Sequence, residues 1–314
     1  MAVRDPAPAP RRAPAAPGGA RAPEVRAPAR APRRSRPGAH PLVWAAALAV
    51  LAFMVAPSVI VMGMSLSASR FLEFPPTTLS LRWYAAYWSD AAWLDATVRS
   101  LQAAVLVTLL AVVLGTMAAL AIVRYAVPGR GALRALIVSP LVVPSIVLAV
   151  GVYGVYAAWG LTGTLTGLVA AHTVLALPFV LLNVGAVLYT LDANLERAAR
   201  ASGAGPVRAF LFVVLPMIWP GIAAGSIFAF LTSFDEIVVA MFITGSSPTL
   251  PKVMFDGIQF ELNPLVAAVS TQLILVSSVA LLSALWLRRR AERLGERRLA
   301  AGEGAEPARA LVAQ

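Results

Sequence analysis

One long uncharged stretch decides the fold class of this chain. It reads ALIVSPLVVPSIVLAVGVYGVYAAWGLTGTLTGLVAAHTVLALPFVLLNVGAVLYTL (135–191) and contains no Asp, Glu, Lys or Arg. As a single helix it would be about 86 Å long, at about 1.5 Å per residue. About 20 apolar residues already cross the ~30 Å hydrocarbon core of a membrane. The stretch must therefore hold two membrane-spanning helices, and the Gly and Thr residues at 160–167 favour a turn between them.

The rest of the chain supports a membrane protein. Of its 314 residues only 13% are charged and 59% are hydrophobic, and the mean hydropathy is +0.77. A soluble domain carries roughly 25% charged residues, so a soluble globular protein is excluded. Further uncharged stretches complete an all-α, polytopic membrane protein with six transmembrane helices, predicted near 42–66, 97–123, 132–159, 164–190, 210–243 and 264–288.

The distribution of charge predicts the orientation in the membrane. The net charge of +11 would suit a nucleic-acid-binding protein, but the two tails hold most of it. With six spans, 22 of the 26 basic residues fall in the tails and in the loops at 124–134 and 191–208. By the positive-inside rule both termini are cytoplasmic. We therefore expect membrane lipid, and no nucleic acid, around this protein.

Composition also divides the chain into three parts. Residues 1–40 are rich in Pro, Ala and Arg, which predicts a disordered cytoplasmic tail. Residues 41–290 form the predicted transmembrane domain, and residues 291–314 form a second cytoplasmic tail. The apolar run after residue 41 is longer than the core of a signal peptide, which favours an uncleaved first span.

Common motifs for catalysis or zinc binding are missing from the sequence. The chain has no cysteine, no H-E-x-x-H zinc motif and no G-x-S-x-G nucleophile motif. Lys252 is the only lysine, so no phosphate-binding P-loop is present. We predict no catalytic residue, no metal site and no bound cofactor. His172 is expected to hydrogen-bond a neighbouring helix. If ATP drives this protein, the ATPase must be another chain.

The loop between the fourth and fifth predicted spans is the most informative segment. It reads LDANLERAARASGAGPVRAF (191–210). Asp192 or Asn194 can cap a short helix that runs through Ala201. Gly203 would end this helix, and Pro206 would begin another. Two short helices make a knob, which could rest on anionic lipid or dock on a protein.

This loop resembles the coupling motif, or EAA motif, of ABC-importer permeases. That motif begins with Glu-Ala-Ala, and a Gly follows after three intervening residues. After nine further residues come an aliphatic residue, one residue of any type, and Leu-Pro. The resemblance implies the type I ABC-importer permease fold, with a coupling loop at 192–216 that docks in a cleft of an ATPase. The coupling residues that it assigns are Glu196, Arg197, Ala198, Ala199, Gly203, Leu215 and Pro216. Arg197 replaces the usual Glu, so the acidic contact is either absent or made by Glu196.

Two other segments extend the resemblance. PLVVPSIVL (140–148) resembles the third span of these permeases, and SFDEIVVAMFITG (233–245), followed by Leu250-Pro251, resembles their spermidine/putrescine branch. The resemblance implies a polyamine importer in a bacterial inner membrane, assembled with a second permease subunit, two ATPase subunits that bind ATP and Mg²⁺, and an extracytoplasmic binding protein. Iron, phosphonates or other small organic solutes stay open as substrates, and a self-sufficient secondary transporter is the alternative class.

Asp235 and Glu236 interrupt the apolar fifth span. Ser233-x-x-Glu236 has the form of a capping box, which predicts that one helix ends near Ser233 and a short one begins. The carboxylates could simply cap that short helix, or they could line the translocation path for a cation; we predict the latter. The first outer loop is crowded with aromatic residues that we expect to anchor the protein at the membrane interface or to contact the binding protein: Trp83, Tyr84, Tyr87, Trp88 and Trp93.

Overall fold

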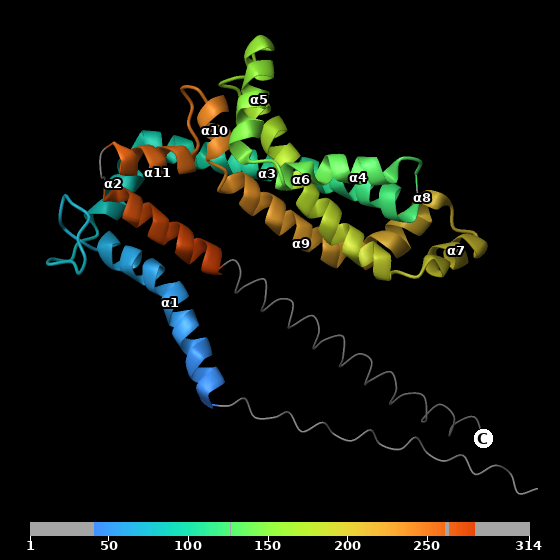
Figure 1. Ribbon diagram of the computed structural model, residues 1–314, viewed down its shortest axis with the longest axis horizontal. Helices are drawn as coiled ribbons and strands as arrows, with labels where there is room; N and C mark the ends of the chain where they lie inside the picture. Colours follow the sequence, from blue (N-terminus) through green and yellow to red (C-terminus); the bar gives the residue numbers. More distant parts are fainter. Residues whose placement is uncertain (1–40, 126, 261–263, 280–314) are drawn as a thin grey trace, which may run out of the picture. The chain divides into compact units, whose positions relative to one another are not determined.

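The computed structural model describes residues 41–125, 127–260 and 264–279 (Figure 1). These residues form helices and connecting loops, apart from an isolated antiparallel bridge between Ser67 and Leu79. The chain divides into two compact units, Met1–Ala52 and Phe53–Gln314, and the boundary falls inside the first helix. The predicted all-α class is confirmed. The predicted tails, 1–40 and 291–314, lie outside the described residues.

The helices follow one another in the order that the uncharged stretches predict. Their bounds are α1 (Pro41–Ser65), α2 (Arg82–Ser89), α3 (Ala91–Ala119) with a final π-helical turn η1 (Leu120–Arg124), α4 (Arg130–Val138) with a 3-10 turn η2 (Ser139–Leu141), α5 (Ser145–Ala158), α6 (Leu165–Thr190), α7 (Ala193–Ala201), α8 (Pro206–Ala209), the π-helical turn η3 (Phe210–Val214), α9 (Leu215–Phe234), α10 (Val238–Ile243), α11 (Leu250–Gln259) and a last helix, Leu265–Val279.

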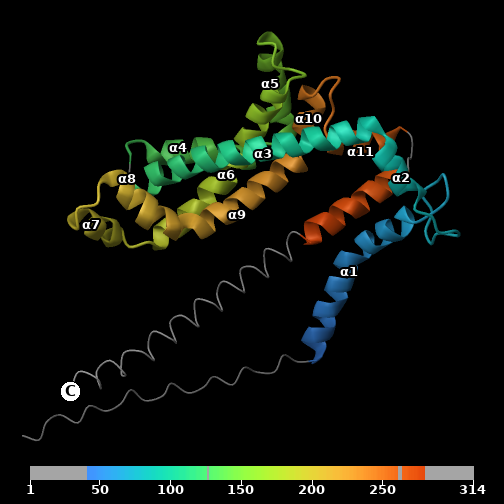
Figure 2. The same ribbon diagram turned by 180° about the vertical axis from the view of Figure 1, so that it is seen from behind.

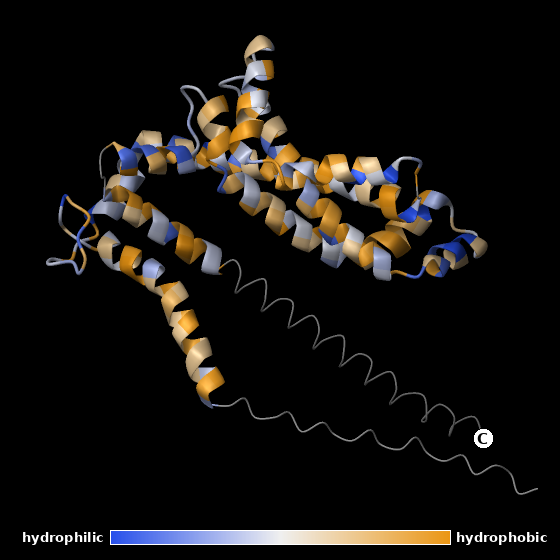
Figure 3. Cartoon of the chain, viewed as in Figure 1, coloured by the Kyte–Doolittle hydropathy of each residue, from blue (hydrophilic) through white to orange (hydrophobic). Residues whose placement is uncertain are grey.

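Four continuous helical segments in the described chain are long and apolar enough to cross a membrane. They match the first, second, fourth and fifth predicted spans: Pro41–Ser65, Ala91–Arg124, Leu165–Thr190 and Pro206–Phe234. Figure 3 shows apolar residues along these segments and hydrophilic residues gathered at α7. The sixth predicted span, 264–288, begins as the apolar helix Leu265–Val279, and its remainder lies outside the described residues.

The third predicted span is not one straight helix. Its two halves, Arg130–Leu141 and Ser145–Ala158, meet at an angle of 103°. Two prolines explain the break, because Pro140 and Pro144 donate no backbone hydrogen bond and disfavour helical geometry in the residue before them. Beyond the break α5 packs against α10, and Ala149, Val239 and Ile243 are buried between them. The prediction of a continuous helix over 132–159 is therefore wrong.

The core of the second unit is a bundle of α3, α6 and α9, which lie side by side in both views (Figures 1 and 2). Val107, Val180 and Val184 are completely buried in it. Glycines allow the helices to approach closely: a Cβ atom at Gly225 would lie 2.9 Å from the Val180 Cα atom. Small residues at crossings hold membrane helices together, since the lipid tails supply no hydrophobic drive for association.

Part of the aromatic cluster belongs to the protein interior. Tyr87 and Trp93 are only 5% and 6% exposed, and they pack with Leu250 and Leu265 in a second core cluster. The prediction that they anchor the protein at the membrane interface is wrong for these two residues, because they face protein rather than lipid headgroups. Trp88, at 64% exposed, stays available for such a role.

Long-range contacts show which segments share an end of the bundle. At one end the Arg124 guanidinium of η1 pairs with the Glu196 carboxylate of α7, which brings together the segments that follow α3 and α6. Toward the other end the Arg99 side chain of α3 donates to the Gly163 carbonyl, which precedes α6 (3.0 Å). There too the Leu250 N–H donates to the Ser100 hydroxyl (2.8 Å). The loops therefore alternate between the two ends, as the predicted spans require.

Candidate functional site

The loop after α6 folds as the sequence predicts. The Asp192 carboxylate accepts a hydrogen bond from the Asn194 N–H (2.9 Å) and caps α7. Gly203, with φ of +91°, adopts the left-handed conformation that ends a helix. Pro206 is the first residue of α8, where its missing N–H is harmless. Together α7 and α8 form a compact element, residues 192–209, which we call the knob.

Glu196 fixes the knob to the bundle. Its carboxylate contacts the Arg124 guanidinium at 3.1 Å and the Arg200 guanidinium at 3.0 Å. The Arg124 and Glu196 side chains are only 13% and 12% exposed, whereas Arg200 is 45% exposed. Arg124 ends η1, so this pair joins α7 to the end of the second span. The Glu196 carboxylate is thus engaged within the chain and does not project from the knob.

The exposed surface of the knob is basic and apolar. Arg197 is exposed and has no ion pair among the described residues. Leu195 and Val207 are 46% and 69% exposed. Exposed apolar residues beside charged ones are typical of a protein interaction surface when they lie together. Arg197 therefore offers a cation at the position where the motif that this loop resembles has a carboxylate.

The residues that the sequence resemblance assigns to coupling lie in two places. Glu196, Arg197, Ala198 and Ala199 lie on α7, and Gly203 follows that helix in the knob. Leu215 and Pro216, by contrast, open α9 directly after η3. Leu215 packs against the core cluster of the bundle, so its place is structural rather than on the knob surface.

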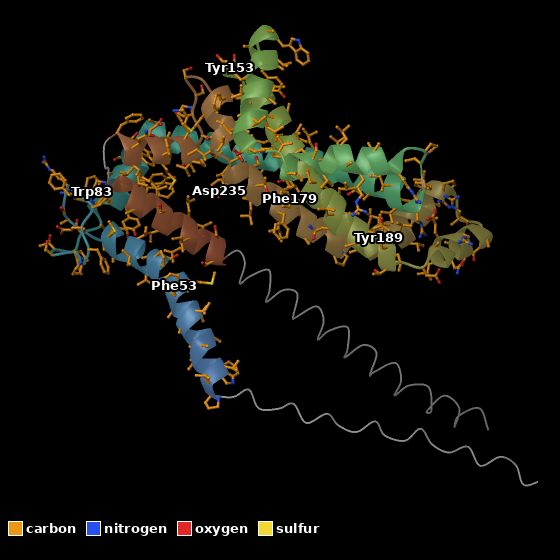
Figure 4. The ribbon with its side chains drawn as sticks, viewed as in Figure 1. Phe53, Trp83, Tyr153, Phe179, Tyr189 and Asp235 are labelled. Atoms are coloured by element: carbon orange, nitrogen blue, oxygen red, sulfur yellow. The ribbon has the colours of Figure 1, made fainter. Side chains whose placement is uncertain are left out.

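The two carboxylates at the other end of α9 have different surroundings. The Glu236 carboxylate accepts a hydrogen bond from the Val239 N–H (3.0 Å) and caps α10. Asp235 is exposed and lines a cavity of about 550 Å³, along with Glu236, Thr232 and Ser277. It also lines a neighbouring cavity of about 250 Å³. Figure 4 shows Asp235 where α9 ends. Glu236 is therefore held as a cap, while Asp235 faces open space.

Ser233 does not complete the predicted capping box. Its hydroxyl lies 3.1 Å from the Nδ1 atom of His172, and both side chains are buried. The break between α9 and α10 is confirmed, but Glu236 caps α10 without Ser233. His172 bonds a neighbouring helix, as predicted, and its Nε2 atom has no partner among the described residues. The buried pair ties the end of α9 to α6.

Replacing Ser233 with alanine is expected to destabilise the protein. The Nδ1 atom of His172 would then lose its hydrogen bond to Ser233, and an unsatisfied buried polar group costs about 1–3 kcal/mol. The thermal unfolding midpoint of the purified chain should fall by several degrees. Ser226→Ala is the control, because that hydroxyl bonds only a carbonyl of its own helix. Equal midpoints for the two variants would refute a stabilising role of the pair.

Within the described residues, no group of three His, Asp or Glu side chains could hold a metal ion. The charged features that the structure does show are the basic knob at one end of the bundle and, at the other end, the unpaired Asp235 carboxylate beside a cavity. Neither arrangement contains a nucleophile paired with a base.

Comparison with known proteins finds transport permeases that are similar to this chain. The chain is 29% identical to the putrescine transport system permease protein PotI of Escherichia coli K12 over 249 residues, 77% of this chain and 88% of that protein. It is 28% identical to the spermidine/putrescine transport system permease protein PotC of the same strain over 237 residues, 75% of this chain and 89% of that protein.

A solved structure shares the fold. The crystal structure of a bacterial ABC transporter involved in the import of the acidic polysaccharide alginate matches with a TM-score of 0.60 at 16% sequence identity, covering 76% of this chain and 94% of that one. Residues 111–294 match the family described as binding-protein-dependent transport system inner membrane component. That match covers more than half of the chain, and the chain therefore belongs to this family of transport permeases.

Proposed function

We propose that the chain is the membrane subunit of an ATP-driven importer of polyamines such as putrescine and spermidine. The observation that carries this proposal is the Asp235 carboxylate, which faces a cavity and has no cationic partner among the described residues. A carboxylate in such a place within a membrane protein attracts cations. Polyamines are cations at neutral pH, and the relatives PotI and PotC are named for their transport.

The partners follow from the same proposal. A second permease subunit completes the path, and an extracytoplasmic binding protein delivers the polyamine. Two ATPase subunits bind ATP and Mg²⁺ and dock on the knob, whose Leu195 and Val207 side chains are exposed for such a contact. Arg197 and Ala198 lie on the same short helix and would contact the ATPase, whereas Glu196 holds the helix in place.

The proposed orientation puts the knob in the cytoplasm of a bacterium, with both termini on that side of the inner membrane. The support is the concentration of basic residues at the knob end of the bundle, at Arg124, Arg130 and Arg134 and again at Arg197, Arg200 and Arg208. Asp235 then lies toward the outer side, where substrate enters. The ATPase subunits, which bind ATP in the cytoplasm, can then dock on the knob.

Asp235→Asn is expected to lower putrescine uptake by about tenfold, which corresponds to about 1.4 kcal/mol. The substitution keeps the shape of the side chain and removes the negative charge that would attract the cation. The measurement is uptake of radiolabelled putrescine by proteoliposomes that contain the importer assembled with its ATPase and binding protein. Assembly, followed by size-exclusion chromatography, should not change.

Asp95→Asn is the matched control, because Asp95 is also exposed and unpaired in the described structure but lines neither cavity. Equal uptake by both variants and the unaltered importer would reject the role of Asp235. A panel of putrescine, spermidine, ferric iron and a phosphonate identifies the substrate class. Stimulation of ATP hydrolysis by the anionic phosphonate but not by the amines would overturn the polyamine proposal.

A further inference from the structure

Two adjoining cavities lie at the knob end of the bundle, away from Asp235. One is about 260 Å³ in volume and lies between η1, α4 and α6. The other is about 300 Å³ and opens toward the start of α4. Both are lined by Ile122, Arg134 and Tyr189, so they form one continuous groove. We call it the inner groove; none of the proposed transport steps uses it.

The mouth of the inner groove is basic. Arg130 and Arg134 are exposed and lie four residues apart on α4, which places them on the same face of that helix. No acidic residue lines either cavity, and neither arginine has an ion pair among the described residues. Tyr189 stands beside them and is 64% exposed. Two unpaired guanidinium groups at one opening favour an anion, and phosphate oxygens suit their geometry.

The depth of the inner groove is apolar. Leu181, Leu182, Gly185 and Ala186 of α6 line it, together with Ile122 and Val123 of η1. From Tyr189 to Leu181 is eight residues of helix, or about 12 Å. Figure 4 shows Tyr189 near the end of α6 that leads to α7. The groove therefore runs from a polar, basic mouth into an apolar bed within the membrane-spanning part of the chain.

A ligand that fits both parts must carry a negative charge at one end and a hydrocarbon chain at the other. A free phosphate ion would leave the apolar bed unused, and a zwitterionic lipid would offer the arginines no net charge. Basic pockets between helices on the cytoplasmic side of membrane proteins suit anionic headgroups. Anionic phospholipid of the inner leaflet has the required charge, length and location.

We propose that the inner groove binds one anionic phospholipid, with its phosphate at Arg130 and Arg134 and an acyl chain along Leu181 and Gly185. This proposal rests on the orientation given above, in which α4 begins at the cytoplasmic face. It does not depend on the transported substrate. Because η1 lines the groove and ends at Arg124, the bound lipid lies next to the element that holds the knob.

The test measures lipid retention by the full-length purified chain with native mass spectrometry, in the absence of any transport substrate. The chain is titrated with palmitoyl-oleoyl phosphatidylglycerol, with the matching phosphatidylcholine, and with glycerol phosphate as a soluble anion. We expect phosphatidylglycerol to be retained at least about tenfold more tightly than phosphatidylcholine, and glycerol phosphate not to displace it. Equal retention of the two lipids, or full displacement by glycerol phosphate, would overturn the proposal.

Two variants test the two parts of the inner groove. Arg130→Gln combined with Arg134→Gln should lower retention of phosphatidylglycerol by at least about tenfold. The control pair, Arg197→Gln with Arg208→Gln, removes the same charge from the knob and should leave retention unchanged. Loss of retention in both pairs would mean that net charge, and not this groove, attracts the lipid.

Gly185→Leu tests the apolar bed without altering the arginines. A Cβ atom at Gly185 would meet only the Val123 Cγ2 atom, at 3.9 Å, so a larger side chain can extend into the cavity. Gly185→Leu is expected to reduce retention while the unfolding midpoint stays within a few degrees of the unaltered chain. Unchanged lipid retention by this variant would contradict a bound acyl chain. The lipid measurements contain no transport substrate, so their results stay valid even if the importer does not take up polyamines.

Discussion

In the proposed ATP-driven importer, replacing Glu196 with glutamine is expected to uncouple ATP hydrolysis from transport and to lower uptake by at least about tenfold. The carboxylate is 12% exposed and bridges Arg124 and Arg200. Without it, the Arg124 guanidinium is left unpaired in a largely buried place. Removing one partner of a buried ion pair costs about 3–5 kcal/mol, an upper bound here because Arg200 is exposed. Uptake and ATP hydrolysis are measured together in proteoliposomes with the complete importer.

A matched control and a charge-swapped variant distinguish loss of the Arg124–Glu196 ion pair from a general loss of charge. Arg200→Gln removes only the exposed partner, and exposed pairs contribute about 0–1 kcal/mol, so little change is expected. In that background, Arg124→Glu combined with Glu196→Arg reverses the pair and should restore most of the uptake. An assembled swapped variant that stays inactive would show that Glu196 acts through another contact, such as the ATPase itself.

The parts of this structure that sequence predicts well are governed by local signals. Uncharged stretches of sufficient length predicted four of the spans, because the cost of burying a charge in hydrocarbon does not depend on tertiary contacts. The knob was also predicted, since Asp192, Gly203 and Pro206 each act within a few residues of their own position. Gly203 also belongs to the motif that carries the resemblance to transport permeases.

The parts that sequence missed depend on residues that are distant in the chain. Arg124 and Glu196 are 72 positions apart, and nothing in either neighbourhood indicates the pair. Ser233 has a local capping pattern, but a buried bond to His172, 61 residues away, takes its hydroxyl instead. The prolines of the third span were visible in the sequence. The 103° bend they permit became definite only through the packing of α5 against α10.

Gly225→Leu is expected to prevent the chain from folding into a stable bundle. Its Cβ atom would lie 2.9 Å from the Val180 Cα atom, so backbone and not a flexible side chain would have to move. Overpacking a core typically costs about 1–3 kcal/mol, and a backbone clash at a helix crossing costs more. We expect the yield of monodisperse protein in mild detergent to fall by more than about tenfold, or the unfolding midpoint to drop by more than about 10 °C.

Gly151→Leu provides a control of the same chemistry. Gly151 lies in the apolar helix α5, and a Cβ atom there would meet nothing within 4 Å. Both substitutions add the same apolar volume and gain about 1 kcal/mol of helix propensity. Only the one at the crossing of α6 and α9 should therefore destabilise the protein. If the two variants unfold at the same temperature, close packing at Gly225 is not what holds these helices together.

Gly225→Ala separates the contribution of close packing from that of side-chain bulk. The alanine variant introduces the Cβ atom alone, so it tests the 2.9 Å approach directly, and an intermediate loss of stability is expected.

The α9 helix joins the knob, through η3, to Asp235 at its far end. A shift of α9 away from α6 would thus disturb both the knob and the cavity beside Asp235. Variants that fold partially should lose ATPase coupling and substrate response together, whereas Glu196→Gln should alter coupling with the Asp235 cavity intact.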